Sequence, residues 1–311
     1  MPVSDMDAII PIFDAIQVHR NEYDSGDTDY SVTTLLDPPR VVHLNKRHVK
    51  DVDLWIQDLM HSFDGTASHA YLEFCLDKVL DKQGKKKYKM EERLRTVIKD
   101  RKVSGAYDVL WTAKHSLWDL KKTSTWKGMF GDQKDWAAQQ NIYRYLLWFN
   151  HQYETKQLNI MAWFRDWSKN NKMRYGPEYP SWPIMAYRLP NWDYNDTYSF
   201  MEERVQVMID NEDVADDDLP LCSYKDMWSS PDKVAVKAVN RKNALRICDD
   251  QEAANKWMSA YLAKDSCKHK RAQLFFDVRI ATRRRCEDWC PVNVYCNQYN
   301  DHLKAVAMGG K

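Results

Sequence analysis

The sequence lacks any long apolar run, so it predicts no membrane-spanning helix. No stretch of its 311 residues approaches the roughly 18 consecutive apolar residues that such a helix needs. Residues 1–20 also lack the basic start and apolar centre of a signal peptide, because Asp5, Asp7 and Asp14 interrupt them. We therefore expect a cytoplasmic protein without a membrane partner, in the host cytoplasm if the protein is viral.

An excess of charge of either sign is also missing. The formal net charge is +1, so a surface for nucleic acid would have to be local. Three short basic runs are candidates for such a surface: Lys85–Lys87, Lys268–Arg271 and Arg283–Arg285. Taken singly, each is most simply a solvated loop or helix end. The seven cysteines are an odd number without a secretory context, which favours a reducing compartment over a disulfide framework.

The chain shows neither an internal repeat nor a low-complexity linker, and its periodicity predicts an α/β (α+β) protein with a mixed central sheet. Helices are expected over 49–63 and 67–79, with a break at Gly65-Thr66, and over 135–149, 195–211 and 249–264. Strands are expected over 93–98, 105–111, 116–121 and 158–164, and an extended crossing over 177–190. The Pro38-Pro39 pair should end any helix before it.

Two acids and a lysine follow one another on the predicted central strands. Asp108 and Asp119 each lie in a short apolar run, and Lys121 shares the face of Asp119 by strand alternation. Hard cations such as Mg²⁺ and Mn²⁺ prefer carboxylate and carbonyl oxygens, so the backbone carbonyl of Leu120 is a further candidate ligand. His69, on the preceding helix, could add an imidazole, which shifts the preference toward Mn²⁺. Metal ions beside a lysine suit phosphodiester hydrolysis.

Gln139 and Tyr143 stand one turn apart on the helix predicted over 135–149. They could hydrogen-bond the phosphate strand or the lysine. Each of these features has an ordinary structural explanation when taken alone: a surface Asp-x-Lys, a hydrogen-bonded histidine at a helix end, or an amphipathic helix. Their fixed order across helix, strand, strand and helix is what favours a nuclease site.

The order Gly65-x3-His69, Asp108, Asp119-x-Lys121, Gln139-x3-Tyr143 resembles the PD-(D/E)XK nuclease superfamily. It is most similar to the RecB-like iron–sulfur exonuclease branch, which includes phage-encoded exonucleases and the CRISPR-adaptation exonucleases. The resemblance implies a restriction-endonuclease-like sheet, metal binding by His69, Asp108 and Asp119, and a catalytic Lys121. The second acid is Asp where Glu is commoner in the family.

Three cysteines crowd together around Trp289-Cys290-Pro291, as Cys286-x3-Cys290-x5-Cys296. Thiolates at such spacing can converge on a metal or a cluster. Cys75, Cys222, Cys248 and Cys267 are the candidates for a fourth ligand. The resemblance selects Cys222, within Leu219-Pro-Leu-Cys222, and implies a [4Fe–4S] cluster. By residue chemistry alone Zn²⁺ fits as well, and buried free cysteines are a further interpretation.

The sequence therefore predicts a metal-dependent DNA exonuclease of (phage) DNA recombination, repair or replication, acting on DNA that is single-stranded or has a free end. The expected organisation is an N-terminal segment over 1–60, a PD-(D/E)XK nuclease core over 61–190 and a helical, cluster-bound region over 191–311. Recombination or replication proteins and further copies of the chain are candidate partners. Alternatives are a non-catalytic, zinc-stabilised nucleic-acid-binding module, an inactive accessory subunit and a structure-specific endonuclease.

Overall fold

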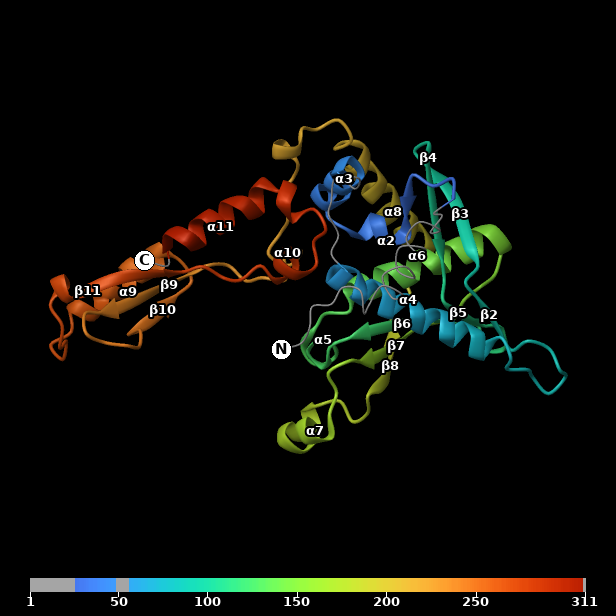
Figure 1. Cartoon of the computed structure of the whole chain (residues 1–311), viewed down its shortest axis with the longest axis horizontal. Helices are drawn as coiled ribbons and strands as arrows, with labels where there is room; N and C mark the ends of the chain where they lie inside the picture. The colour runs from blue at the N-terminus through green and yellow to red at the C-terminus, as the bar shows by residue number, and fades with distance from the viewer. Residues whose placement is uncertain (1–25, 49–55, 310–311) are drawn as a thin grey trace. The chain divides into compact units, whose positions relative to one another are not determined.

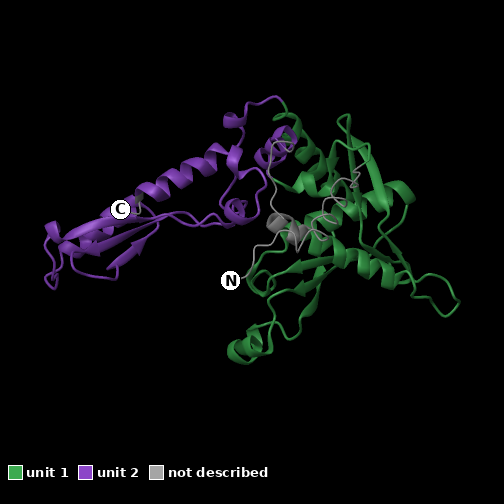
Figure 2. Ribbon diagram, viewed as in Figure 1, with its two compact units in different colours: residues 1–37, 54–212 green, residues 38–53, 213–311 purple. Residues whose placement is uncertain are grey.

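The structure is a computed structural model that describes residues 26–48 and 56–309. The chain forms two compact units (Figure 2). Unit 1 comprises Met1–Asp37 and Leu54–Glu212, and unit 2 comprises Pro38–Asp53 and Asp213–Lys311. Their boundaries differ from the expected divisions at residues 60 and 190, because 38–53 join the C-terminal part and 191–212 stay with unit 1.

Unit 1 is built on a five-stranded mixed sheet in the order β2-β5-β6-β7-β8 (Figure 1). The strands are β2 (Tyr88–Met90), β5 (Val109–Trp111), β6 (Ser116–Thr123), β7 (Gln157–Phe164) and β8 (Ile184–Leu189). Only β6 and β7 are parallel neighbours in this sheet. The α/β class and the mixed sheet are therefore confirmed.

The parallel pair β6 and β7 requires a crossover, which α5 (Thr125–Phe130) and α6 (Lys134–His151) provide. The helix α6 is mostly buried, and Ile142, Leu146 and Leu147 are at most 1% exposed. This burial holds α6 against the core of unit 1, so the polar residues on the helix have fixed positions. The prediction of a helix over 135–149 and of a strand over 158–164 is confirmed.

A second sheet of unit 1 has the order β1-β4-β3. Its strands are β1 (Tyr30–Ser31), β3 (Arg93–Ile98) and β4 (Arg101–Ala106), and the helices α2 (Val32–Leu36) and α8 (Tyr194–Ile209) belong to the same unit. The prediction of one strand over 105–111 is wrong, because the chain leaves β4 after Ala106 and enters β5 of the other sheet at Val109. Asp108 lies at this junction between the sheets.

One continuous helix, α4 (Ile56–Leu76), replaces the two helices expected around Gly65-Thr66, so the predicted break is wrong. Residues 49–55 of the first expected helix lie outside the described residues. A glycine inside a helix costs only about 1 kcal/mol and does not by itself end it. The Ser68 Oγ donates a hydrogen bond to the Asp64 carbonyl oxygen across this point. The break at Pro38-Pro39 is confirmed: α2 ends at Leu36 and α3 (Pro39–His48) begins on the second proline.

Unit 2 contains α3 and a C-terminal part that is not all helical, which corrects the expected helical region. Besides α9 (Gln251–Leu262), α10 (Arg284–Asp288) and α11 (Asn297–Gly309), it holds an antiparallel sheet in the order β10-β9-β11. These strands are β9 (Lys233–Ala238), β10 (Arg246–Cys248) and β11 (Leu274–Arg279). None of the helices in the described residues is both long enough and apolar enough to cross a membrane.

Candidate functional site

The middle strand of the five-stranded sheet, β6, carries an acid and a lysine on the same face. The Lys121 Nζ lies 2.9 Å from the Asp119 Oδ2 and donates a 3.1 Å hydrogen bond to the Asp119 Oδ1. Asp119 is only 1% exposed. Its burial raises the pKa of the carboxyl, and the positive charge of Lys121 opposes that rise.

One oxygen of Asp119 has spare capacity for a ligand. The Oδ2 atom is buried and accepts no hydrogen bond from the described residues, although the Lys121 ammonium lies close to it. Buried carboxylate oxygens normally accept hydrogen bonds or bind a metal. Asp108 and His69 are near enough for their charges to act on the Asp119 carboxyl. The Asp119 carboxylate can therefore accept a further partner, but it does not belong to the group of His69, Glu91 and Asp108, whose ligand atoms all lie within 4.8 Å of one another.

Asp108 connects β6 to the helix α4. Its Oδ2 atom accepts a 2.7 Å hydrogen bond from the backbone N–H of Leu120, and the Nδ1 of His69 lies 3.2 Å from the same oxygen. The first contact fixes Asp108 beside β6, one residue from Asp119. The second brings the His69 imidazole from α4 to the same carboxylate oxygen.

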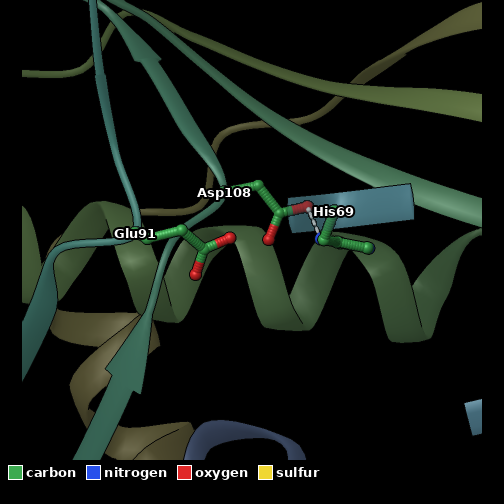
Figure 3. A group of neighbouring side chains, drawn as sticks. All are labelled: His69, Glu91 and Asp108. Atoms are coloured by element: carbon green, nitrogen blue, oxygen red, sulfur yellow. Dashed lines mark ion pairs between the residues drawn. The ribbon is translucent and has the colours of Figure 1, made fainter. Parts of the chain in front are cut away.

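His69, Glu91 and Asp108 form a group that could hold a metal ion (Figure 3). One ligand atom from each residue lies within 4.8 Å of the corresponding atoms of the other two. The hydrogen bond with Asp108 raises the pKa of His69. Loss of hydration, together with the charge of Asp108, raises the pKa of Glu91 to about 7, although the residue keeps contact with solvent.

Glu91 was missed by the sequence analysis. It lies between β2 and β3 with a φ of 50°, in the left-handed region that is uncommon for residues other than glycine. Its backbone N–H donates a 3.3 Å hydrogen bond to the Asp108 carbonyl oxygen, and this bond holds the turn beside Asp108. The available signal was the acid pair Glu91-Glu92 directly before a strand, which is equally typical of a solvated turn.

Gln139 and Tyr143 extend the site from α6. The Gln139 Nε2 donates a 3.2 Å hydrogen bond to the Tyr143 hydroxyl, and both side chains are buried. Burial, with the charges of Asp119 and Asp108, raises the pKa of Tyr143, so its hydroxyl stays protonated and can donate. Gly105 permits this position, because a Cβ there would lie 2.7 Å from the Tyr143 ring.

Mn²⁺ should stabilise this protein more strongly as the pH rises from about 6 to about 8. The raised pKa values of Glu91 (to about 7) and His69 mean that protons stabilise the metal-free fold at low pH. That stability is lost as the pH rises through these values, whereas metal binding needs the deprotonated groups. The measurement is the shift in melting temperature on adding millimolar Mn²⁺ at each pH.

Glu91→Gln should reduce the Mn²⁺-dependent shift, because it replaces a carboxylate that is charged at high pH by a neutral amide, a weaker ligand. Glu203→Gln is the matched control, since Glu203 is an exposed acid on α8. A shift that does not change with pH, or that Glu203→Gln reduces equally, would contradict metal binding at this group.

The four predicted cysteines of unit 2, Cys222, Cys286, Cys290 and Cys296, line one cavity together with apolar side chains such as Leu44 and Val292. Their sulfurs do not form a group as tight as His69, Glu91 and Asp108 among the described residues. A single tetrahedral Zn²⁺ with bonds of about 2.3 Å would need such a tight group.

Two thiols of this cavity, those of Cys222 and Cys286, are held in their protonated form when no metal is bound. Burial and the neighbouring cysteines raise the pKa of Cys222 to about 12 and that of Cys286 to about 11. Of the other cysteines, Cys75 is exposed, and Cys248 is buried within the core of the β10-β9-β11 sheet. Neither is part of the cavity lining.

A buried arginine, Arg40 of α3, lies against the cysteine cavity. It is 1% exposed and has no carboxylate partner among the described residues. The guanidinium instead donates to the carbonyl oxygens of Leu219 and Pro220 and to the Asn297 Oδ1, and its Nη1 lies 4.0 Å from the Cys296 Sγ. An isolated buried cation is unfavourable. Metal-bound thiolates in the cavity would supply negative charge next to it.

Comparison with known proteins does not identify a family. No family profile matches the chain, and no curated protein is similar to it. Among the solved structures that match, the crystal structure of SSO0001 aligns with 65% of this chain and 86% of its own, at 15% sequence identity and a TM-score of 0.43. We draw nothing about function from so distant a likeness.

Proposed function

We propose that the protein is a metal-dependent deoxyribonuclease that hydrolyses phosphodiester bonds in DNA, acting as an exonuclease. One observation carries the proposal: Asp108, Asp119 and Lys121 come together beside His69, and the buried Asp119 Oδ2 accepts no hydrogen bond from the described residues but lies 2.9 Å from the Lys121 ammonium. Asp119 is fully buried beside the partly buried Asp108, and two adjacent carboxylates with one lysine are unfavourable unless a further cation compensates their charge. The resemblance to the RecB-like nucleases rests on the same residues.

His69, Asp108 and Asp119 would hold the metal, with Glu91 as an additional ligand. The Leu120 carbonyl fits the same role. In a strand, the N–H and C=O of one residue point to the same side. The Leu120 N–H points to Asp108, and β5 pairs with β6 only as far as Trp118. The Leu120 carbonyl is therefore directed past the end of β5, toward Asp108. Oxygen ligands with one imidazole suit Mn²⁺ or Mg²⁺.

When bound, Mn²⁺ or Mg²⁺ would neutralise negative charge on the phosphate and lower the pKa of a bound water molecule. The chain itself provides the remaining groups. The Lys121 ammonium, held by Asp119, is placed to neutralise a phosphate oxygen or to orient the attacking water. The protonated Tyr143 hydroxyl and the Gln139 amide can donate hydrogen bonds to the phosphate backbone. Asp108 keeps His69 in position, since its Oδ2 lies 3.2 Å from the imidazole Nδ1.

The proposal is tested by digesting end-labelled linear DNA and closed circular DNA with Mn²⁺, with Mg²⁺ and with EDTA. We expect metal-dependent loss of the linear DNA while the circle persists. Cleavage of the circle would instead favour a structure-specific endonuclease. Binding to DNA without any cleavage would favour the non-catalytic, zinc-stabilised module or an inactive accessory subunit. The order in which labelled products appear reports the polarity and the preference for single-stranded ends.

For the cysteine cavity we propose a [4Fe–4S] cluster bound by Cys222, Cys286, Cys290 and Cys296, with Zn²⁺ as the alternative. Support comes from the shared cavity, from its apolar lining and from Arg40, which has no carboxylate partner in the described chain. A cluster with several iron atoms accommodates sulfurs that are further apart than one zinc ion does. Its role would be structural, because it would join the segment around Cys222 to the terminal cysteines.

Cys290→Ser should remove the brown colour and the bound iron from protein purified without oxygen. The change replaces one of four thiolate ligands by a weaker oxygen donor. Cys267→Ser is the matched control, because Cys267 lies outside the cavity and contacts the His269 carbonyl oxygen. Stoichiometric zinc without iron in the unmodified protein would decide for the alternative.

A further inference from the structure

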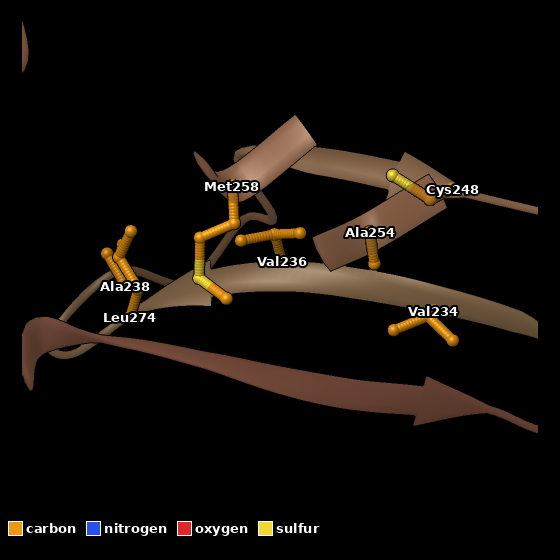
Figure 4. Packing of buried hydrophobic residues seen from close by; sticks show 7 residues of the cluster. All are labelled: Val234, Val236, Ala238, Cys248, Ala254, Met258 and Leu274. Atoms are coloured by element: carbon orange, nitrogen blue, oxygen red, sulfur yellow. The ribbon is translucent and has the colours of Figure 1, made fainter. Parts of the chain in front are cut away.

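The chain between Cys222 and Cys286 contains a small module with its own core, which we call the β-module (residues 233–279). It consists of β9, β10, α9 and β11. Seven buried residues, among them Val236, Met258 and Leu274, pack between the sheet and the helix (Figure 4). The module contributes no cysteine to the cavity lining, so the role of its surface has to be explained separately.

The register of the sheet defines two ends of the β-module. Cys248 pairs with Val234, and Arg279 pairs with Lys233, so the ends of β10 and β11 lie beside the start of β9. At the opposite end, Leu274 pairs with Ala238, and the Val239 N–H donates a 2.8 Å hydrogen bond to the Gln273 carbonyl oxygen. The turn after β9 and the segment before β11 therefore lie together. We call this the distal end (residues 240–245 and 263–273).

The distal end is strongly basic. It carries six exposed cations and one acid, Asp265, whereas four acids cluster where the module joins the rest of unit 2. The six cations are Arg241, Lys242, Lys264, Lys268, Lys270 and Arg271. The four acids are Asp232, Asp249, Asp250 and Glu252. Within the described part of the chain, none of the six cations forms an ion pair with a carboxylate, so their charges are available to a ligand.

We propose that the distal end of the β-module binds the phosphate backbone of nucleic acid without reading its sequence. The inference rests on the proposed function, since a nuclease encounters this polyanion as its substrate. Exposed lysines and arginines that lack acidic partners give salt-dependent, sequence-independent binding. Taken alone, the Lys268–Arg271 run is explained as a solvated segment. Together with Arg241 and Lys242 in the turn beside it, the run forms a larger basic surface that can contact several phosphates.

The chemistry of the distal end favours nucleic acid over an anionic membrane. Stable attachment to a membrane needs apolar groups that insert, in addition to basic residues. Two exposed large hydrophobic residues, Val239 and Phe275, adjoin this end. Within the distal end itself, the exposed side chains are polar or charged apart from two small ones, Ala263 and Ala272. Phosphate contacts by several flexible cations need no such insertion.

The test measures binding of a fluorescein-labelled oligonucleotide, single-stranded and duplex, by anisotropy in EDTA, so that no cleavage occurs. Lys268→Glu/Lys270→Glu should weaken binding at least tenfold at low salt. It should also reduce the slope of log affinity against log salt by about 0.7 to 0.9 for each phosphate that the variant no longer neutralises. Arg241→Glu/Lys242→Glu, from the other segment of the distal end, should do the same.

Lys256→Glu/Arg279→Glu is the matched control, because it makes the same change of charge in the same module away from the distal end. Both residues are exposed. Lys268→Gln/Lys270→Gln should give an intermediate reduction in affinity, and thermal melts check that each variant is folded. Equal reductions in the control and the distal variants would overturn the proposal. So would unchanged DNA binding with weaker binding to phosphatidylserine vesicles.

This outcome is separable from that of the proposed function. Absence of cleavage, together with EDTA-resistant binding that depends on the distal end, would leave the β-module proposal standing and remove the nuclease. If the protein cleaves DNA normally and the distal variants bind DNA as tightly as the unmodified protein, the nuclease proposal stands and the β-module proposal fails.

Discussion

Lys121→Met should lower the rate of DNA cleavage on the order of 10²–10³-fold, the loss typical of removing one positioned group that stabilises charge in a transition state. The Lys121 ammonium is held by the buried Asp119 carboxylate, 2.9 Å away. Its charge therefore has a fixed position beside the proposed metal ligands. The rate is measured on end-labelled DNA with saturating Mn²⁺, so that weaker metal binding does not contribute.

Lys122→Met provides a close control from the same strand. Lys122 points to the opposite face of β6, where its Nζ donates to the Asp64 Oδ1 at 2.6 Å and to the Ser68 Oγ at 3.1 Å. Cleavage by this variant should stay within a few-fold of the unmodified rate. Similar rate reductions in both lysine variants would mean that general positive charge, and not the position of Lys121, matters.

The Lys121 variant leaves Asp119 buried without its cation, which could lower stability. The double variant Asp119→Asn/Lys121→Met removes both charges and keeps the shape of the site, so it should fold and still not cleave. Asp119→Asn alone should also be inactive, because the amide is a poor ligand for Mn²⁺. Normal cleavage by the folded double variant would refute the assigned site.

Arg40→Met should destabilise unit 2 by about 3 kcal/mol or more, because each of several acceptors left without its donor costs about 1–3 kcal/mol. The backbone carbonyl oxygens of Leu219 and Pro220 would lose their donor, and the segment leading to Cys222 would be released. Arg40→Lys should not restore stability, since one ammonium cannot replace the planar guanidinium at these separated acceptors. Hydrogen exchange of the α11 amides, which lie in unit 2, should accelerate by at least a hundredfold.

Arg47→Met is the control for that experiment. Arg47 lies on the same helix, and its side chain is 27% exposed in an ion pair with Asp216. Partly exposed pairs contribute at most about 1 kcal/mol, so exchange in α11 should change little. Retained metal and unchanged exchange in Arg40→Met would show that the guanidinium does not hold the cysteine cavity together.

The residues proposed for the site follow from local sequence patterns, whereas parts of the backbone that carries them do not. Asp119 and Lys121 could be placed on one face because alternation along a strand is a local property. Glu91 could not be found, because its position depends on a left-handed turn and on a hydrogen bond to the Asp108 backbone, which is distant in sequence. The predicted helix break at Gly65 was wrong for a related reason. One glycine lowers helix propensity only slightly, and the residues on both sides of it are sufficient to keep the helix continuous.

In unit 2, too, the sequence predicts local features better than contacts between distant segments. The spacing of Cys286, Cys290 and Cys296 is local, and their shared cavity could be expected. The β10-β9-β11 sheet was not predicted, because β10 is only three residues long and its pairing with β9 depends on a turn between them. The distal end of the β-module becomes apparent only once strand register brings its two segments together.

Because Lys121 and Lys122 point to opposite faces of β6, the site depends on the number of residues between the acid and the lysine. A single residue inserted between Asp119 and Lys121 would turn every following side chain of the strand to the other face. Lys122 would then come to the face of Asp119, but as the fourth residue after it, about 7 Å further along the strand than Lys121 is now. Divergent chains that keep this chemistry can therefore change the connecting loops freely, but must keep the lysine two residues after the acid.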